Sequence, residues 1–423
     1  MRTYDTYKDS GIAWLGQIPS HWEVKRLGSF FNERRQKVSD KDFEPLSVTK
    51  LGIFPQWENV AKTNDGDNRK LVRKGDFVIN SRSDRKGSSG VSELDGSVSL
   101  INIVLSPKET VVPAFCNYLL KCNSFIEEYY RIGRGIVADL WTTRYQEMKC
   151  MDIAMPPLAE QEAIVNYLTN ATAKIDEAIA QQQKMIDLLK ERKQIIINEA
   201  VTHGLDPNVP MKQTGIDWLP QIPALWEFVR IKNIASVKTG KTPPSEDKHY
   251  FDNGTVLWFT PADFDSSNIY LNESQRHITQ KAISEKVAFL FPPNSVLMIG
   301  IGGTLGRIGF CKNSCFSNQQ INAIIVNNNY NPIYLAYCLK SEFDYIWSRA
   351  NTATMPIINQ QATKDLLVTC PPFDEQEIIA NEIEMKCLPL NEAISRHKRM
   401  ITLLNERKQI VINDVVTGKI KVK

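Results

Sequence analysis

The chain has 423 residues, 51 Lys and Arg against 48 Asp and Glu, and a formal net charge of +3. Its composition of 42% hydrophobic and 23% charged residues excludes a disordered or collagen-like protein and predicts two or three globular domains. No apolar run approaches the roughly 18 residues of a membrane span. Because the first residues also lack the apolar core of a signal peptide, we expect a cytoplasmic protein with reduced cysteines.

The first element along the chain is a tryptophan-rich segment that occurs twice. Residues 9–27 and 213–231 are identical at ten of nineteen positions. A longer match joins residues 156–202 to residues 371–417 without a gap, with 23 identities in 47 positions. Since both matches occur in the same order, the sequence predicts two copies of one unit of roughly 200 residues.

A mixed region follows each tryptophan-rich segment. Strand-like runs lie at residues 76–79 and 97–106 in the first copy, and at 295–301 and 321–326 in the second. A helix is expected next, over residues 114–131 and 332–348. These middle regions barely match each other, which is typical of one frame that carries two different recognition surfaces.

A long helix is predicted to close each copy. Both helices begin at Pro-Pro followed by Glu-Gln-Glu, which suits a helix N-terminus. Apolar residues then recur at heptad spacing and predict a coiled coil between the two copies. We expect Pro389 to kink or break the second helix. The predicted seam residues are Leu168, Ile175, Ile179, Ile186, Leu189 and Ile196, with Ile383, Leu390, Ile394, Ile401, Leu404 and Val411.

No string in the sequence forms a convincing catalytic motif. Residues 240–242 resemble the end of a phosphate-binding loop but lack its first glycine, and residues 300–306 lack the third glycine of a dinucleotide fingerprint. The latter glycines are expected to form a tight turn between strands or to let the backbone approach a ligand. Residues 370–373 share Pro-Pro-Phe with amino-methyltransferases, but Cys370 replaces the polar residue and a helix start is favoured. Cys311 and Cys315 lack a second pair at zinc spacing.

The mixed regions instead carry basic and amide side chains in loops rich in Gly and Ser. Such residues grip phosphates and read base edges, although a solvated polar loop is the alternative for each one alone. The predicted DNA contacts are Arg69, Lys70, Arg82, Ser83, Arg85 and Lys86 in the first copy, and Lys238, Lys241, Thr242, Arg276, Thr304, Arg307, Asn318, Gln319 and Gln320 in the second.

The two closing helices share a charged stretch that offers two equivalent surfaces to a partner. A solvated helix face is the alternative. The predicted partner-binding residues are Glu191, Arg192, Lys193 and Gln194, with Glu406, Arg407, Lys408 and Gln409.

The doubled Gly-Ile-x-Trp-Leu, Pro-Pro-x-x-Glu-Gln-Glu and Leu-Leu-x-Glu-Arg-Lys-Gln motifs resemble those of type I restriction-modification specificity subunits. Residues 238–243, 258–261, 302–307 and 317–320 are similar to elements of the target recognition domains in that family. The resemblance implies an α+β fold in which two α/β target recognition domains are separated by two long helices, which form an antiparallel coiled coil with internal pseudo-two-fold symmetry. The corresponding ranges are 1–155 and 204–370 for the domains, and 156–203 and 371–423 for the helices.

The resemblance also implies a function without catalysis in this chain. The family reads a bipartite site in double-stranded DNA and assembles with two modification subunits and with restriction/translocase subunits. S-adenosylmethionine, ATP and Mg²⁺ are expected on those partners, and this chain is expected to hold no cofactor or metal. Two alternatives stay open: a self-contained nuclease or methyltransferase with duplicated DNA-binding heads, and an adaptor that never contacts DNA.

Overall fold

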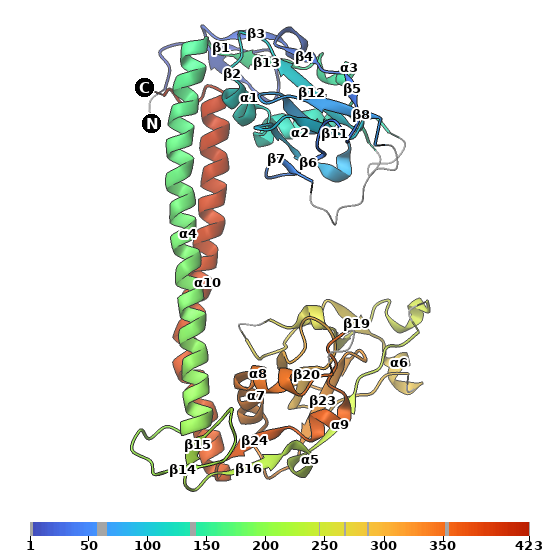
Figure 1. The fold of residues 1–423 in the computed structure, drawn as a ribbon, viewed down its shortest axis with the longest axis vertical. Helices are drawn as coiled ribbons and strands as arrows, with labels where there is room; N and C mark the ends of the chain where they lie inside the picture. The colour runs from blue at the N-terminus through green and yellow to red at the C-terminus, as the bar shows by residue number, and fades with distance from the viewer. Residues whose placement is uncertain are drawn as a thin grey trace. The chain divides into compact units, whose positions relative to one another are not determined.

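The computed structural model describes residues 3–56, 66–135, 141–244, 246–265, 268–285, 287–351 and 355–422. The chain divides into two compact units. Unit 1 comprises Met1–Gln182 with Arg399–Lys423, and unit 2 comprises Gln183–Lys398. The predicted closing helices are present as α4 (Leu158–His203) and α10 (Phe373–Val416), and each contributes one part to each unit (Figure 1).

The two long helices pack against each other in antiparallel directions within each unit, as predicted. In unit 1, Ile164 and Leu168 of α4 share a core with Val411 and Val415 of α10. In unit 2, residues 197–201 of α4 share a core with residues 379–387 of α10. All twelve predicted seam residues are buried or half-buried, so the heptad spacing identified the buried face correctly.

Two equivalent lysines cross the helix pair, one in each unit. Lys193 Nζ donates to Asn391 Oδ1 at 2.7 Å, and Lys408 Nζ donates to both carboxylate oxygens of Asp176 at 2.7 Å. Lys193 and Lys408 occupy the same place in the sequence repeat, as do Asp176 and Asn391. The repeat is therefore a structural pseudo-symmetry, in which one unit uses a carboxylate where the other uses an amide.

Pro389 does not break α10. The helix continues from Phe373 to Val416 through the proline, so the expected break is wrong. The proline ring lies on an exposed part of the helix surface. The carbonyl that would have accepted its missing N–H therefore does not need another donor inside a protein core.

The Glu-Gln-Glu motif attaches the start of each long helix to the globular part of the chain that precedes it, which we call the head of that unit. Gln161 and Gln376 are 0% and 1% exposed. Gln376 Oε1 accepts from the Asn331 N–H at 2.8 Å, while its Nε2 donates to the Pro371 carbonyl at 2.9 Å. Gln161 bonds in the same way to the Val112 N–H and the Pro156 carbonyl.

We expect Gln376→Ala to lower the free energy of unfolding of unit 2 by about 1–3 kcal/mol, because it leaves a buried N–H and a buried carbonyl without partners. Urea unfolding would measure the loss. Gln194→Ala, at an exposed position of α4 in the same unit, is the matched control and should change the free energy by less than about 0.5 kcal/mol. Equal losses in the two variants would contradict the assigned role of Gln376.

The preceding glutamate of the motif holds the tryptophan-rich segment. Trp22 Nε1 donates to Glu160 Oε1, and Trp226 Nε1 donates to Glu375 Oε1, both at 3.1 Å. Both indoles are almost fully buried. The tryptophan-rich segment and the Glu-Gln-Glu motif thus contact each other in both units, which explains why the two motifs recur together in the sequence.

Each unit also contains small antiparallel strand pairs formed in part by its tryptophan-rich segment. In unit 1, β1 (Tyr7–Asp9) pairs with β2 (Gln17–Pro19), and β3 (Glu23–Arg26) pairs with β13 (Asp152–Met155). In unit 2, β14 (Met211–Gln213) pairs with β15 (Gln221–Pro223), and β16 (Glu227–Arg230) pairs with β24 (Leu367–Cys370).

The head of unit 1 contains a four-stranded antiparallel sheet in the order β10-β9-β12-β4 and a three-stranded sheet in the order β11-β8-β5. The strands are β4 (Phe31–Glu33), β5 (Lys37–Val38), β8 (Arg69–Val72), β9 (Phe77–Asn80), β10 (Ser89–Val91), β11 (Gly96–Val98) and β12 (Asn102–Pro107), with a hairpin of β6 (Leu46–Val48) and β7 (Ile53–Pro55). The helices are α1 (Pro113–Leu119), α2 (Asn123–Arg131) and α3 (Tyr145–Met148).

The head of unit 2 repeats the four-stranded antiparallel sheet, in the order β17-β23-β20-β21. Its three-stranded sheet, β19-β18-β22, contains one parallel pair. The strands are β17 (Ala235–Thr239), β18 (Val256–Phe259), β19 (Arg276–Ile278), β20 (Ser295–Ile299), β21 (Ile308–Cys311), β22 (Phe316–Ser317) and β23 (Ile321–Val326). The helices are α5 (Ile231–Ile234), α6 (Gln280–Ser284), α7 (Pro332–Ser341), α8 (Phe343–Ser348) and α9 (Gln360–Lys364).

The four-stranded sheets have equivalent strand orders although their sequences barely match. Strands β4, β9, β10 and β12 correspond to β17, β20, β21 and β23. Two sequence expectations need correction. The run 97–106 forms two strands in different sheets, and each expected single helix after the sheet is a pair, α1 with α2 and α7 with α8.

Candidate functional site

Three segments that the sequence analysis singled out meet in unit 2. The Gly240 N–H donates to the Ile321 carbonyl and the Lys241 N–H to the Ser317 carbonyl, both at 2.9 Å. The Gly300 N–H donates to the Gln320 carbonyl at 2.7 Å. The Thr242 hydroxyl also donates to Gln319 Oε1. The structure therefore joins the loops after β17 and β20 to the segment between β22 and β23.

The glycines in these loops serve close backbone contacts. A Cβ on Gly240 would lie 2.2 Å from the Asn318 carbonyl oxygen, and one on Gly300 would lie 2.8 Å from the Ile358 carbonyl oxygen. Gly302 adopts a φ of +95°, which favours glycine. The expected tight turn between strands is confirmed for residues 300–306, which connect β20 to β21.

The predicted contacts in unit 2 differ in their access to a ligand. Lys238, Lys241, Arg276 and Gln319 are exposed, while Thr242, Thr304, Arg307 and Gln320 are half-buried. Asn318 is 8% exposed, and its side chain bonds to the side chain and the N–H of Gln320. Asn318 therefore shapes the loop in this structure, and its contact with DNA stays a prediction.

Aromatic rings and one carbonyl hold the two arginines of this site. The Arg276 guanidinium lies 4.5 Å from the ring centre of Phe251 and 5.0 Å from that of Trp258. Trp258 also pairs with Phe316 in the parallel β18–β22 ladder, so Arg276 is carried on the sheet that leads into residues 317–320. Arg307 donates from Nη1 to the Phe264 carbonyl at 3.3 Å.

In unit 1 the predicted contacts 82–86 form a short loop after β9. Arg82 is exposed. Lys86 Nζ pairs with Glu127 at 2.6 Å, and the Arg85 guanidinium lies 3.7 Å from the Asp84 carboxylate. Because their charges are balanced by nearby carboxylates, Arg85 and Lys86 add less positive potential than the sequence indicated.

The predicted contacts Arg69 and Lys70 are structural residues. Arg69 is 4% exposed and its guanidinium donates to the hydroxyl and the carbonyl of Ser97. Lys70 Nζ donates to the Asn102 carbonyl at 2.7 Å, and burial lowers the pKa of its ammonium group. Both cations join strands inside the head, so neither is available to a duplex in this structure.

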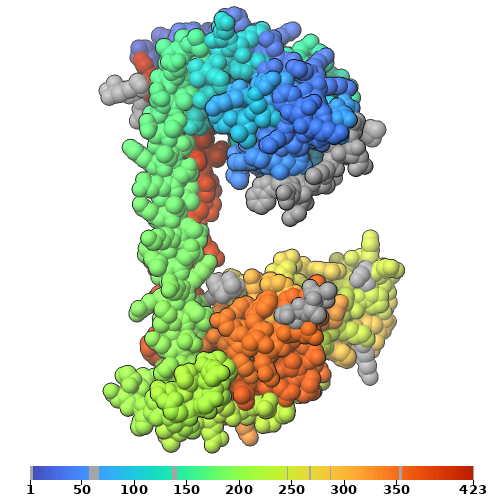
Figure 2. Space-filling model, in the orientation of Figure 1, coloured from blue at the N-terminus to red at the C-terminus, as the bar shows by residue number. Residues whose placement is uncertain are grey.

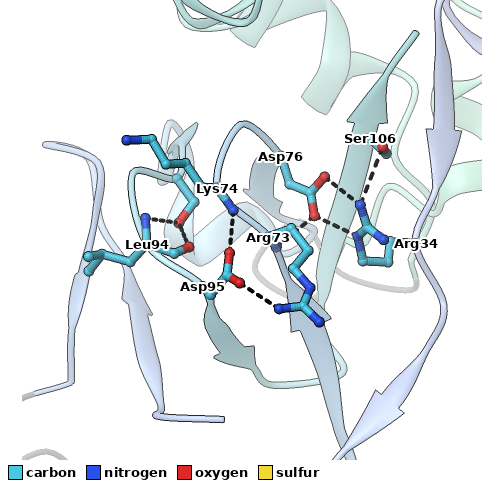
Figure 3. Close-up of polar contacts among 8 residues, drawn as sticks. Arg34, Arg73, Lys74, Asp76, Leu94, Asp95 and Ser106 are labelled. Carbon is cyan, nitrogen blue, oxygen red and sulfur yellow. Dashed lines mark hydrogen bonds and ion pairs between the residues drawn. The ribbon is translucent and has the colours of Figure 1, made fainter.

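The neighbouring cations belong to a network of ion pairs (Figure 3). Arg34 binds both oxygens of Asp76, at 2.6 and 3.0 Å, and the Asp76 carboxylate raises the pKa of Arg34. Asp95 accepts from the Lys74 N–H and the Arg73 guanidinium, and these bonds lower its pKa. The basic run at 69–74 is thus strand β8 and the start of the turn after it, and its cations are held by hydrogen bonds and ion pairs within the head.

Both units hold the loop after the central strand with the same four backbone hydrogen bonds, which we call the loop junction. In unit 1, residues 81–83 and Arg134 bond to residues 141–143. The N–H groups of Ser83 and Thr143 donate to the carbonyls of Trp141 and Ser81, and Arg134 and Thr142 exchange two bonds, all at 2.9–3.2 Å.

The loop junction of unit 2 uses residues 300–302, Asn351 and residues 356–358. The Gly302 and Ile358 N–H groups donate to Pro356 and Gly300, and Asn351 and Ile357 exchange two bonds, all at 2.8–3.0 Å. The same positions thus carry Arg82 and Arg134 in unit 1 but Ile301 and Asn351 in unit 2.

Sequence reasoning missed Arg134, whose side chain is 82% exposed and whose guanidinium lies 3.8 Å from the Glu147 carboxylate. The sequence contained only a weak signal for this residue. Thr142 and Ile357 are separated by the same constant spacing as the closing-helix repeat, so the repeat extends upstream to them. The side chains in this stretch differ too much for residue identities to reveal the repeat.

The charged stretch on the long helices divides into exposed and buried residues. Glu191, Arg192 and Gln194 are exposed, as are Glu406, Arg407 and Gln409. Lys193 is 6% exposed and Lys408 is half-buried, and both bond across the helix pair. These two lysines belong to the coiled coil in this structure, and their contact with a partner stays a prediction.

An apolar stripe, missed in the sequence, accompanies the charged stretch in both copies. Its residues are Met185, Leu188 and Ile195 on α4, and Met400, Leu403 and Ile410 on α10, each 43–59% exposed. The two sets occupy equivalent repeat positions. Figure 2 shows one face of the helix pair, on which α4 side chains (green) lie at the surface.

Among the described residues, no group of three or more His, Cys, Asp or Glu side chains could hold a metal ion. Within the same part of the chain, none of the helices combines the length and the apolar character needed to cross a bilayer.

Comparisons with known proteins point to a single family. Residues 223–384 match the family model described as type I restriction modification DNA specificity domain. The MjaVIII specificity subunit of a type I restriction enzyme from Methanocaldococcus jannaschii is 22% identical over 96% of this chain and 95% of that protein. The MjaIX specificity subunit from the same organism is 30% identical over 40% of this chain and 39% of its own length.

A solved structure shares the fold over most of the chain. It comes from a study of complex assembly and conformational transition of the type I restriction-modification system. It has a TM-score of 0.66 at 16% identity and covers 95% of this chain and 99% of that chain. The chain is thus similar over nearly its whole length to specificity subunits of type I restriction enzymes, and residues 223–384 match the domain of that family.

Proposed function

We propose that this chain is the DNA-recognition subunit of a type I restriction-modification complex, and that each unit reads one half of a bipartite site. The observation that carries this proposal is the loop junction, which occurs twice with the same backbone bonds and different side chains. Base edges are distinguished by the side chains presented to a groove, so one frame with two side-chain sets suits two different half-sites.

The same proposal assigns two modification subunits to the two apolar stripes. Each stripe exposes three large apolar residues beside a charged segment, which is typical of an interface with an apolar centre and a polar rim. Restriction/translocase subunits complete the complex. S-adenosylmethionine, Mg²⁺ and ATP are held by those partners in the cytoplasm, and this chain contributes recognition without catalysis.

The alternative of a self-contained nuclease or methyltransferase gains no support from the comparisons. Mapping of methylated adenines across the genome, with and without the gene for this chain, tests the proposal. We expect one bipartite motif to lose its methylation when the gene is deleted. An unchanged methylation pattern in a strain that expresses the modification subunit would contradict the proposal.

Helix length should set the number of base pairs between the half-sites. Both long helices run without interruption through the border between the units. Four residues added to each helix, after Gln182 and after Lys398, lengthen the pair by about 6 Å, which is nearly two base pairs at about 3.4 Å each. We expect methylation at sites with a longer spacer and unchanged half-sites.

The paired insertion leaves each unit internally intact, including the Lys193–Asn391 and Lys408–Asp176 bonds. An insertion in α4 alone is the control, because it shifts one helix past the other and should reduce activity at every spacer. An active doubly extended protein that kept the original spacer would show that the helices do not determine the spacing.

A further inference from the structure

The segments that precede β12 in unit 1 and β23 in unit 2 have the same backbone frame. In unit 1 the Asn102 N–H donates to the Ser99 carbonyl at 3.0 Å, and in unit 2 the Ile321 N–H donates to the Asn318 carbonyl at 3.3 Å. Asn102 and Ile321 are also the first residues of these equivalent strands. Residues 99–101 of unit 1 therefore correspond one by one to residues 318–320 of unit 2.

One residue next to the central strand fixes this segment to the loop junction in each unit. The Ser81 N–H donates to the Ile101 carbonyl at 3.3 Å, and the Gly300 N–H donates to the Gln320 carbonyl at 2.7 Å. The carbonyls of Ser81 and Gly300 accept bonds of the loop junction described above. The segment before β12 thus lies directly beside the loop junction of unit 1, as its counterpart does in unit 2.

The side chains on this shared frame differ in chemical character. Unit 2 has two amides, with Gln319 exposed and Gln320 half-buried. Unit 1 has Leu100 and Ile101 at the same positions, and each of these apolar side chains is 41% exposed. Adjacent exposed apolar side chains are a common mark of an interaction site. The sequence analysis selected the amides as candidate DNA contacts and passed over their apolar counterparts.

The neighbouring charges indicate what covers the apolar pair. Arg82 and Arg134 on the adjoining loop junction are exposed, so the surface combines cations with apolar side chains. Double-stranded DNA matches this combination, because its phosphates are anionic and the C5 methyl group of thymine is the apolar group that the bases present in the major groove. Adenine instead presents a donor and an acceptor that suit a glutamine amide.

We propose that Leu100 and Ile101 are specificity-determining residues of unit 1 and contact the C5 methyl groups of thymines in its half-site. The equivalent Gln319 contacts adenine in the half-site of unit 2. This inference rests on the proposed function and names the chemistry by which each half-site is read. One backbone frame thus supports two kinds of recognition, by apolar contact in unit 1 and by hydrogen bonds in unit 2.

The test replaces every thymine of one half-site by deoxyuridine, which keeps the hydrogen-bonding groups of thymine and lacks its methyl group. Fluorescence anisotropy of the full-length protein at fixed salt measures the affinity. The half-site of unit 1 is the one whose binding depends on Arg82 and Arg134. We expect deoxyuridine there to weaken binding about fourfold for each contacted methyl group. The double variant Leu100→Ala with Ile101→Ala should bind the thymine and deoxyuridine duplexes equally.

Leu94→Ala is the matched control, because Leu94 is an exposed leucine of the same head in the turn between β10 and β11. This variant should keep the preference for thymine. Deoxyuridine in the other half-site controls for the altered DNA, and its effect should be the same in the unaltered protein and in the double variant. Thermal unfolding confirms that each variant is folded.

The proposal is overturned if the unaltered protein binds both duplexes of this half-site equally, or if the folded double variant keeps the preference for thymine. It is also overturned if the double variant binds DNA normally but loses a modification subunit in native mass spectrometry, because the apolar pair then contacts protein. Failure of the proposed function itself gives a different result, in which the unaltered protein does not distinguish its mapped site from a scrambled duplex of the same composition.

Discussion

Replacing Arg82 and Arg134 together by alanine is expected to weaken binding to one half-site at least tenfold and to leave the other half-site unaffected. Both residues sit on the loop junction of unit 1, where their backbones bond to residues 141–143, and both side chains are exposed. A lost base or phosphate contact costs about 1–3 kcal/mol. Fluorescence anisotropy with duplexes altered in one half-site at a time measures the effect.

Arg131→Ala is the matched control, since Arg131 is an exposed arginine of the same unit whose guanidinium already pairs with Glu128 at 2.6 Å. It should leave the affinity for both half-sites within twofold. If the double variant lost affinity equally on duplexes altered in either half-site, the assignment of one half-site to each unit would be wrong.

Placing a charge in an apolar stripe is expected to remove one modification subunit from the complex. Leu188 and Leu403 are 49% and 48% exposed at equivalent positions. Leu188→Asp and Leu403→Asp should each leave a complex with one modification subunit, because a buried unpaired carboxylate costs several kcal/mol at an interface. The double variant should carry none. Native mass spectrometry of the co-expressed complex counts the subunits.

Gln181→Asp introduces the same carboxylate at an exposed position of α4 and should preserve the full complex. A wild-type complex that saturates at one modification subunit would contradict the proposal of two equivalent docking faces. So would single variants that each lose both subunits.

The sequence predicted the long helices and their buried seam well, because a heptad pattern reports directly on which face is buried. The same pattern places Lys193 at a seam position, four residues after Leu189 and three before Ile196. Its charge made it look like a surface residue, whereas its burial and its bond to Asn391 place it in the coiled coil.

The heads were harder to predict from local patterns. Residues 97–106 look like one continuous strand, but their two ends pair with different partners, β8 and β9, and pairing is decided by distant segments. The role of Arg69 was missed for the same reason. Its bonds to Ser97 join strands 28 positions apart in the chain, and nothing near Arg69 in the sequence indicates that the guanidinium is buried.

The division of the long helices between the units has a consequence for synthesis on the ribosome. Unit 2 is built from one continuous stretch, Gln183–Lys398, whereas unit 1 combines Met1–Gln182 with Arg399–Lys423. Trp22 and Pro19 pack against Gly418, which is translated much later. The N-terminal head therefore stays incomplete until residues 399–423 have been made. A nascent chain that stalls after residue 398 would present a finished second unit and an unfinished first one.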